Sequence, residues 1–420
     1  MREMKDSGVE WIGEIPKNWK LKRMKYFCDE RVESSYYNKN LDTYIGLENI
    51  ESYADELIET SSEYPEKVYD FCHDGDVLFG KLRPYLAKCI IAPFSANCTG
   101  ELLVLYSKEN NHRFIRYWLL SDDFLKKVDS STYGAKMPRA NSTYILNLPV
   151  PDVSVMEQAA IVSYLDRHCA AIDRTIKATK ASIDKLKEYK RAIIARAVTK
   201  GLNPDAEMKN SEVDWIGEIP VTWDTINLKY TGSFDNGLTY APADVKDNGL
   251  LVLRSSNIQD GTLDFKDCVY VEKVPKNLLV KKGDIIICSR NGSAKLVGKC
   301  ALVDNELNAT FGAFMMRYRT NLNHVFAYYL LQVALYSNRH LFSTTTINQL
   351  TRGIIVQIKV AIPTEQEQEN IVVYLADRCK YIDNLIAKKE QLIAKFTEYR
   401  QSLIYAAVTG KIDCREEETA

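Results

Sequence analysis

Two similar segments of fourteen residues, with an identical Trp-Ile-Gly-Glu-Ile-Pro core, occur in this chain of 420 residues, and this repeated phrase constrains the fold more than any other feature. The segment SGVEWIGEIPKNWK begins at Ser7, and SEVDWIGEIPVTWD begins at Ser211. Four of the five tryptophans lie in these two copies, a concentration that chance does not explain. A repeat at this spacing indicates that a whole structural unit is duplicated.

A second repeated segment follows each copy of the first, so the chain has the order A–B–A′–B′. Glu157–Asp173 matches Glu367–Asp383, and the match extends to the Ala-Val-Thr sequences at Ala197 and Ala407. Each B segment follows a proline, ends near a glycine, and carries apolar residues at alternating spacings of three and four. These residues are Ile161, Leu165, Ile172, Ile176, Ile183, Leu186, Ile193 and Ala197, and Ile371, Leu375, Ile382, Ile386, Ile393, Phe396, Leu403 and Ala407.

We expect residues 151–200 and 363–410 to form two long spacer helices. A long helix with one apolar seam must bury that seam, and the other copy is the nearest partner. The pattern therefore favours an antiparallel two-helix coiled coil. The alternative is two separate helices, each packed on its own domain.

The A segments, residues 1–150 and 201–362, are predicted to be two mixed α/β domains. Matching strands are expected at Asp42–Ile50 and Leu250–Ile258, and again after the Gly-Asp pairs at Gly75 and Gly283. Helices are expected near Phe114–Leu120 and Val325–Leu335. The predicted fold class is α/β (α+β) with an internal pseudo-two-fold repeat, ending in a solvated tail at residues 411–420.

The sequence carries no recognisable enzyme motif. Gly75–Lys81 fits G-x-x-x-x-G-K, but Leu82 follows where a phosphate loop needs Ser or Thr, and Pro84 disfavours the required helix start. The ten cysteines contain no Cys-x-x-Cys pair, so no metal is expected. The absence of a signal peptide and of an apolar run of membrane-spanning length predicts a cytoplasmic protein with reduced thiols.

Charge is arranged locally, although the net charge is only −1. Val77–Gly100, Ser130–Pro151, Ile285–Val303 and Leu307–Thr364 contain no Asp or Glu. These tracts combine Lys and Arg with Asn, Gln and hydroxyl residues, a mixture that suits phosphate contacts and base readout in DNA. The candidate DNA-binding residues are Lys81, Arg83, Lys88, Lys136, Arg139 and Asn141 in the first copy, and Arg254, Arg290, Asn291, Lys295, Lys299, Asn348, Gln349 and Arg352 in the second.

The order and doubling of these motifs resemble the specificity subunits of type I restriction–modification systems. The resemblance lies in the two Trp-Ile-Gly-Glu-Ile-Pro phrases, the Gly-Asp strands, the Glu-Gln pairs after prolines and the Ala-Val-Thr ends. It implies that each A segment reads one half of a bipartite, asymmetric double-stranded DNA target, and that the helices set the spacer. It also implies a subunit without catalytic activity or cofactors. Two modification subunits would supply S-adenosylmethionine chemistry, and two restriction subunits would use ATP and Mg²⁺.

Two other functions are consistent with parts of the sequence. A coiled-coil scaffold without DNA contact would explain the long seams and the nearly neutral charge, but not the paired acid-free tracts. A phosphate-loop NTPase would depend on Gly80 and Lys81 alone.

Overall fold

The computed structural model describes residues 2–134, 137–342 and 348–415. The chain divides into two compact units, one made of Met1–Lys180 with Lys389–Ala420 (unit 1) and the other of Ala181–Lys388 (unit 2). Two long helices, α4 (Val155–Lys200) and α7 (Glu365–Val408), each contribute one end to each unit. None of the described helices combines the length and apolarity needed to cross a membrane.

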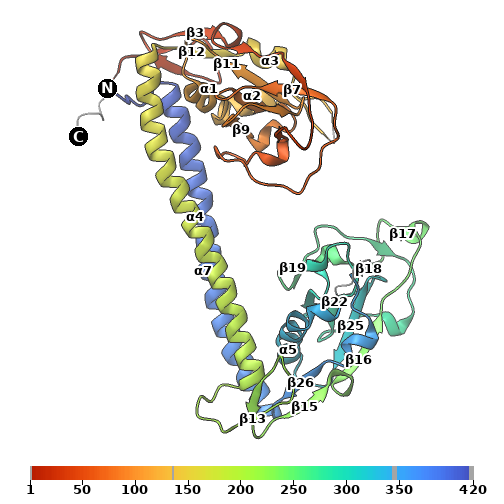
Figure 1. The fold of residues 1–420 in the computed structure, drawn as a ribbon. Helices are drawn as coiled ribbons and strands as arrows, with labels where there is room; N and C mark the ends of the chain where they lie inside the picture. The colour runs from red at the N-terminus through yellow and green to blue at the C-terminus, as the bar shows by residue number, and fades with distance from the viewer. Residues whose placement is uncertain (1, 135–136, 343–347, 416–420) are drawn as a thin grey trace. The chain divides into compact units, whose positions relative to one another are not determined.

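Unit 1 is built from short strands with three short helices against them (Figure 1). Its helices are α1 (His112–Leu119), α2 (Asp122–Asp129) and α3 (Ser142–Asn147). Its strands are β1 (Met4–Asp6), β2 (Glu14–Pro16), β3 (Lys20–Arg23), β4 (Asp29–Glu30), β5 (Ser34–Tyr36), β6 (Tyr44–Ile45), β7 (Val68–Cys72), β8 (Val77–Gly80), β9 (Cys89–Ile91), β10 (Ala96–Cys98), β11 (Leu102–Tyr106) and β12 (Pro149–Asp152).

Unit 2 repeats this arrangement with its own helices and strands. Its short helices are α5 (His324–Ser337) and α6 (Arg352–Ile355). Its strands are β13 (Met208–Asn210), β14 (Glu218–Pro220), β15 (Asp224–Asn227), β16 (Gly232–Asn236), β17 (Val245–Lys246), β18 (Leu250–Leu253), β19 (Ile258–Gln259), β20 (Thr262–Leu263), β21 (Tyr270–Val271), β22 (Ile285–Cys288), β23 (Cys300–Leu302), β24 (Ala309–Phe311), β25 (Met315–Thr320) and β26 (Lys359–Ile362).

The strand that follows each Gly-Asp pair lies inside a four-stranded sheet. The order is β4-β11-β8-β9 in unit 1 and β16-β25-β22-β23 in unit 2. Alternate residues of β8 face different cores, because Val77 and Phe79 join one hydrophobic cluster and Leu78 joins another. Ile285–Cys288 shows the same division. Burial on both faces explains why these strands are continuous apolar runs.

The predicted strand at Asp42–Ile50 is wrong over its second half. Strand β6 stops at Ile45, and Leu47–Asn49 form a 3₁₀ turn in which the Asn49 Oδ1 atom accepts the Gly46 N–H at 2.9 Å. In unit 2 the strand likewise ends at Leu253, and Asn257 Oδ1 accepts the Arg254 N–H at 2.9 Å. An asparagine side chain offers the backbone an alternative to the strand ladder, and here that alternative forms.

The two long helices pack against each other within each unit, as the periodicity predicts. In unit 1 the beginning of α4 shares a core with the end of α7, through Ile161 and Leu165 against Leu403 and Ala407. In unit 2 the end of α4 shares a core with the beginning of α7. The helices are therefore antiparallel, and the predicted fold class is confirmed.

Ion pairs at equivalent places accompany the helix seam. Arg400 Nε lies 2.9 Å from Asp173 Oδ1 in unit 1, and Lys190 Nζ lies 2.7 Å from Asp383 Oδ2 in unit 2. Arg400 corresponds to Lys190 in the repeat, and Asp173 corresponds to Asp383. The ion pairs between the helices are therefore duplicated together with the apolar seam.

The repeated tryptophan phrase is attached to the start of a long helix. In unit 1 the Trp19 Nε1 atom donates to Glu157 Oε2 at 3.1 Å, and in unit 2 Trp223 Nε1 donates to Glu367 Oε1 at the same distance. Both indoles are buried. The phrase and the Glu-Gln pair, which are the two clearest repeats in the sequence, are therefore in direct contact.

The glutamine after each glutamate fixes a second helix. Gln158 Oε1 accepts the backbone N–H of Asn111, the N-cap of α1, at 2.8 Å. Gln368 Oε1 accepts the N–H of Asn323, the N-cap of α5, at 3.0 Å. Each Glu-Gln pair thus connects the phrase, a long helix and the helix against the sheet.

Residues 411–415 differ from the solvated tail that the sequence suggests. Cys414 is buried, and Asp413 Oδ1 lies 2.7 Å from Arg2 Nη2. Arg2 also pairs with Glu157 at 2.6 Å, so this end of the chain packs onto unit 1. Residues 416–420 lie outside the described residues.

We predict that replacing Trp19 or Trp223 with Phe lowers the free energy of unfolding by about 1–3 kcal/mol, because the glutamate, buried in unit 1 and half-buried in unit 2, loses its indole donor. Trp215→Phe is the matched control, since Trp215 belongs to the same phrase and is only half-buried. Chemical denaturation of the three variants measures the effect. An equal loss in all three would contradict the role of the Trp–Glu hydrogen bond.

Candidate nucleic-acid interface

The last residues of β8 and β22 lead into one backbone frame that both units share. In unit 1, Lys81 N–H donates to Glu101 O at 2.8 Å, and Lys81 O accepts from Ala140 N–H at 2.9 Å. In unit 2, Ser289 N–H donates to Phe314 O at 2.9 Å, and Ser289 O accepts from Leu350 N–H at 2.8 Å.

Isolated bridges extend this frame by one residue, joining Leu82 to Arg139 and Arg290 to Gln349. The frame makes several residues structural counterparts. Arg83 corresponds to Asn291, Arg139 to Gln349 and Glu101 to Phe314. Four of these six are predicted DNA-binding residues, and they occupy equivalent places in the two copies.

Unit 2 has a hollow of about 1090 Å³ beside this frame. It brings together four of the eight residues predicted in this copy, Arg254, Arg290, Asn291 and Asn348. Two arginines and no acidic side chain are among its lining residues, which favours an anionic or hydrogen-bonding occupant. We call this surface the unit 2 hollow.

The polar groups of the unit 2 hollow are held by neighbouring side chains and carbonyls. Arg254 pairs with Asp267 at 2.7 Å, and Asn291 Nδ2 donates to Ser255 Oγ at 2.9 Å. Asn348 Nδ2 reaches Gly292 O at 3.4 Å. The Arg290 guanidinium lies over the ring of Phe314, 5.4 Å from its centroid. Stacking uses the face of the guanidinium and leaves the N–H groups at its edge for an acceptor.

The other predicted residues of unit 2 are more dispersed. Lys295 and Arg352 are exposed, and Arg352 opens helix α6 after the N-cap Thr351. Gln349 is exposed at the frame opposite Arg290. Lys299 does not line the unit 2 hollow, and its ammonium group donates to the Ile258 carbonyl.

In unit 1 the predicted residues fall into two groups. Lys81, Arg83 and Arg139 lie at the frame, where Arg83 N–H donates to Pro138 O and the Arg139 guanidinium pairs with Glu101. Asn141 instead caps helix α3, its Oδ1 atom accepting from the backbone of Thr143 at 2.8 Å. Lys136 lies outside the described residues.

Lys88 and Lys299 are counterparts with the same internal contacts. Lys88 Nζ donates to Leu47 O at 2.7 Å and to Ile50 O at 2.9 Å, and Lys299 Nζ donates to Ile258 O at 2.9 Å. Burial lowers the pKa of the Lys299 ammonium. Both lysines hold the 3₁₀ turn that follows a strand.

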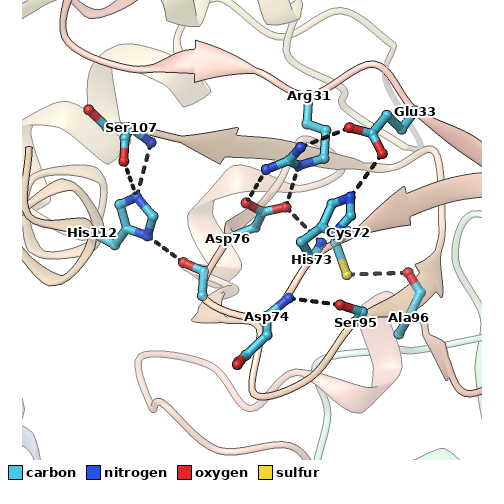
Figure 2. Close-up of polar contacts among 11 residues, drawn as sticks. Arg31, Glu33, Cys72, His73, Asp74, Asp76, Ser95, Ala96, Ser107 and His112 are labelled. Carbon is cyan, nitrogen blue, oxygen red and sulfur yellow. Dashed lines mark hydrogen bonds and ion pairs between the residues drawn. The ribbon is translucent and has the colours of Figure 1, made fainter. Parts of the chain in front are cut away.

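The Gly-Asp pair that precedes each frame is a structural device. Figure 2 shows Asp76, which is buried, receiving Arg31 Nε at 2.6 Å and the His73 backbone N–H at 2.8 Å. Gly75 has a φ of +86°, and its carbonyl lies 2.6 Å from His112 Nδ1. The motif therefore forms a turn into strand β8, and Gly75–Lys81 does not form a loop that leads into a helix.

In unit 2 the equivalent aspartate has an arginine partner from a different place, because Arg31 follows strand β4 whereas Arg319 lies in strand β25. Asp284 is buried and receives Arg319 Nε at 2.7 Å, and this hydrogen bond raises the pKa of the Arg319 guanidinium. In unit 1 the Glu33 carboxyl also has a lowered pKa, because His73 and Arg31 donate to it. The buried aspartate charge is compensated by an arginine in both units, although the arginine comes from a different part of the fold in each.

Three residues at the frame or in the unit 2 hollow are absent from the sequence-based prediction: Glu101, Ser255 and Phe314. Glu101 directly follows the acid-free tract that ends at Gly100, so the absence of acids does not point to it. Ser255 and Phe314 line the unit 2 hollow but carry no charge. Within the described residues, no three His, Cys, Asp or Glu side chains are grouped to hold a metal ion.

Comparisons with known proteins agree on one family. Residues 220–395 match the family model described as "Type I restriction modification DNA specificity domain". The MjaVIII type I restriction enzyme specificity subunit of Methanocaldococcus jannaschii is 24% identical, over 98% of this chain and 94% of that protein. The EcoKI specificity subunit of Escherichia coli K12 is 29% identical over 47% of this chain and 44% of that protein.

A solved structure has the same fold. The chain, from work on complex assembly and conformational transition of the type I R-M system, aligns with a TM-score of 0.68 and 17% sequence identity. The alignment covers 95% of the present chain and 99% of the solved one. The two-unit, two-helix architecture is thus an established one.

We predict that Lys299→Met destabilises the protein by about 1–3 kcal/mol, because the Ile258 carbonyl loses its donor. Lys295→Met is the control, since Lys295 is exposed. Thermal unfolding of both variants checks the expectation. Equal melting temperatures would mean that the Lys299 ammonium does not hold the turn.

Proposed function

Because the chain belongs to the family of type I restriction–modification specificity subunits, we propose that unit 1 and unit 2 each read one half of a split DNA target. The observation that carries the proposal is the shared frame. It presents Lys81, Arg83 and Arg139 in unit 1, and Arg290, Asn291 and Gln349 in unit 2. Equal frames with different side chains suit two readers of different sequences.

The residue types of the unit 2 hollow match the chemistry of base edges. Arginine donates two parallel hydrogen bonds to guanine, and asparagine pairs with the adenine edge. Arg290 is exposed and oriented by Phe314, while Asn291 and Asn348 are anchored beside it. Lys295 and Arg352 are exposed and suit phosphate contacts, which position the protein without reading sequence.

Residues 1–150 and 201–362 are proposed to be the two target-recognition domains, with 151–200 and 363–410 as the spacer helices. The repeat offers equivalent surfaces to two copies of one partner, as expected for two modification subunits. Two restriction subunits would complete the complex. In this proposal the chain itself is not catalytic and works in the cytoplasm, while the partners bind S-adenosylmethionine, ATP and Mg²⁺.

We predict that Arg290→Ala, in the full chain assembled with its modification subunits, weakens binding to the specific DNA by about 1–3 kcal/mol and relaxes one position of the target. Arg352→Ala should weaken binding to all sequences equally and reduce its salt dependence. Arg196→Ala, an exposed arginine on α4, is the control. Fluorescence anisotropy at several salt concentrations measures these effects.

The DNA-binding function would be contradicted if the assembled complex showed no salt-dependent binding to DNA. That outcome would favour a coiled-coil scaffold. Unchanged affinity and target in both Arg290→Ala and Arg352→Ala would instead move the reading surface of unit 2 to another place.

We predict that inserting seven residues into each of α4 and α7, in phase with the apolar seam, lengthens the unspecified gap of the target and leaves both halves unchanged. Seven helical residues add about 10 Å, which corresponds to roughly three base pairs. Sequencing of DNA selected by the complex gives the gap. Altered half-sites with an unchanged gap would show that the helices do not set the spacer.

A further inference from the structure

One position of the shared frame carries opposite chemistry in the two units. It lies just before β11 in unit 1 and just before β25 in unit 2, and it is Glu101 in one and Phe314 in the other. The equivalence is fixed by the backbone, because the strand registers pair Leu102 with Gly80 and Met315 with Cys288.

Glu101 is an acid at the edge of a cationic surface. Its backbone carbonyl accepts the Lys81 N–H, and its carboxylate pairs with Arg139. The preceding 24 residues, Val77–Gly100, contain no other acid. A carboxylate here opposes phosphate binding, so a surface that served only to attract the DNA backbone would not place one in it.

The Glu101 carboxylate has acceptor capacity left over. Arg139 occupies Oε1, while none of the described residues donates a hydrogen bond to Oε2. Oε2 is itself buried, so an incoming group cannot reach it. The side chain as a whole is 26% exposed, and a carboxylate oxygen such as Oε1 can accept a second hydrogen bond beside the one from Arg139. A base that presents an amino group can donate to Oε1.

Phe314 offers the opposite surface at the same place. Its side chain is 59% exposed, and it lines the unit 2 hollow under the Arg290 guanidinium. An exposed aromatic ring next to cationic and amide groups can contact the methyl group of thymine, which projects into the major groove.

We propose that this frame position is a specificity determinant in both units. Glu101 accepts a hydrogen bond from the exocyclic amino group of a cytosine in one half-site, and Phe314 packs against a thymine methyl group in the other. The proposal rests on the proposed function, and it adds the base that each unit selects at this position. Arg139 and Arg290 then act beside it, the first by orienting the carboxylate and the second by stacking on the ring.

The test is the set of DNA sequences that the full chain, assembled with its modification subunits, retains from a random pool. The wild-type complex should retain a split motif with a fixed cytosine in one half and a fixed thymine in the other. Glu101→Ala should relax the cytosine position alone, by about 5- to 150-fold in relative affinity. Glu101→Gln should shift that position toward adenine, because an amide pairs with the adenine edge.

Two further variants complete the design. Glu109→Gln is the matched control, because Glu109 is an exposed acid of unit 1 away from the frame. Phe314→Ala should relax one position of the other half and leave the first half intact. Thermal unfolding of each variant shows whether it is folded, and the nearly isosteric Glu101→Gln decides the question if Glu101→Ala does not fold.

The outcomes separate the two proposals. If Glu101 variants change affinity for all sequences equally, or leave the motif intact, the residue only holds Arg139 and the specificity proposal is wrong while DNA recognition stands. A wild-type motif without cytosine in either half would also overturn it. If the wild-type complex retains no motif at all, the proposed function itself fails.

Discussion

A hydrogen bond from a buried tryptophan to the glutamate near the start of a long helix holds each unit together. Trp19 and Glu157 form it in unit 1, and Trp223 and Glu367 form it in unit 2. The adjacent glutamine fixes the N-terminus of α1 or α5, so the sheet, its helix and the long helix become one body. Both repeated segments of the sequence meet in this contact, and changing the glutamate leaves a buried indole N–H without its acceptor.

Because this contact fixes the helices and the sheet of each unit, other side chains can differ between unit 1 and unit 2. The buried aspartates Asp76 and Asp284 both pair with an arginine, although Arg31 follows strand β4 and Arg319 lies in strand β25. The frame beyond β8 and β22 keeps its backbone hydrogen bonds while Glu101 is exchanged for Phe314. The side chains proposed to read DNA differ between the units, while the backbone that carries them stays the same. Placing variable binding residues on a constant scaffold is a general arrangement in proteins.

The sequence predicted the features that depend on periodicity and repetition, and it was weaker where local polar contacts decide. The helix seams and the strands after the Gly-Asp pairs follow from apolar spacing. The end of β6 does not, because Asn49 diverts the backbone. Lys88 and Lys299 were predicted to contact phosphates because they are cations in acid-free tracts. Their ammonium groups donate to backbone carbonyls within the fold, which a count of charges does not reveal. Glu101 is not predicted because it is an acid at the edge of a tract whose only signal is the absence of acids.

The most direct test of the central claim is a map of adenine methylation in DNA from cells that express this chain with active modification subunits, compared with cells that lack only this chain. We expect a split motif, two short halves around a fixed gap, to be methylated only when the chain is present. An identical methylation pattern with and without the chain would contradict its role as the DNA-reading subunit.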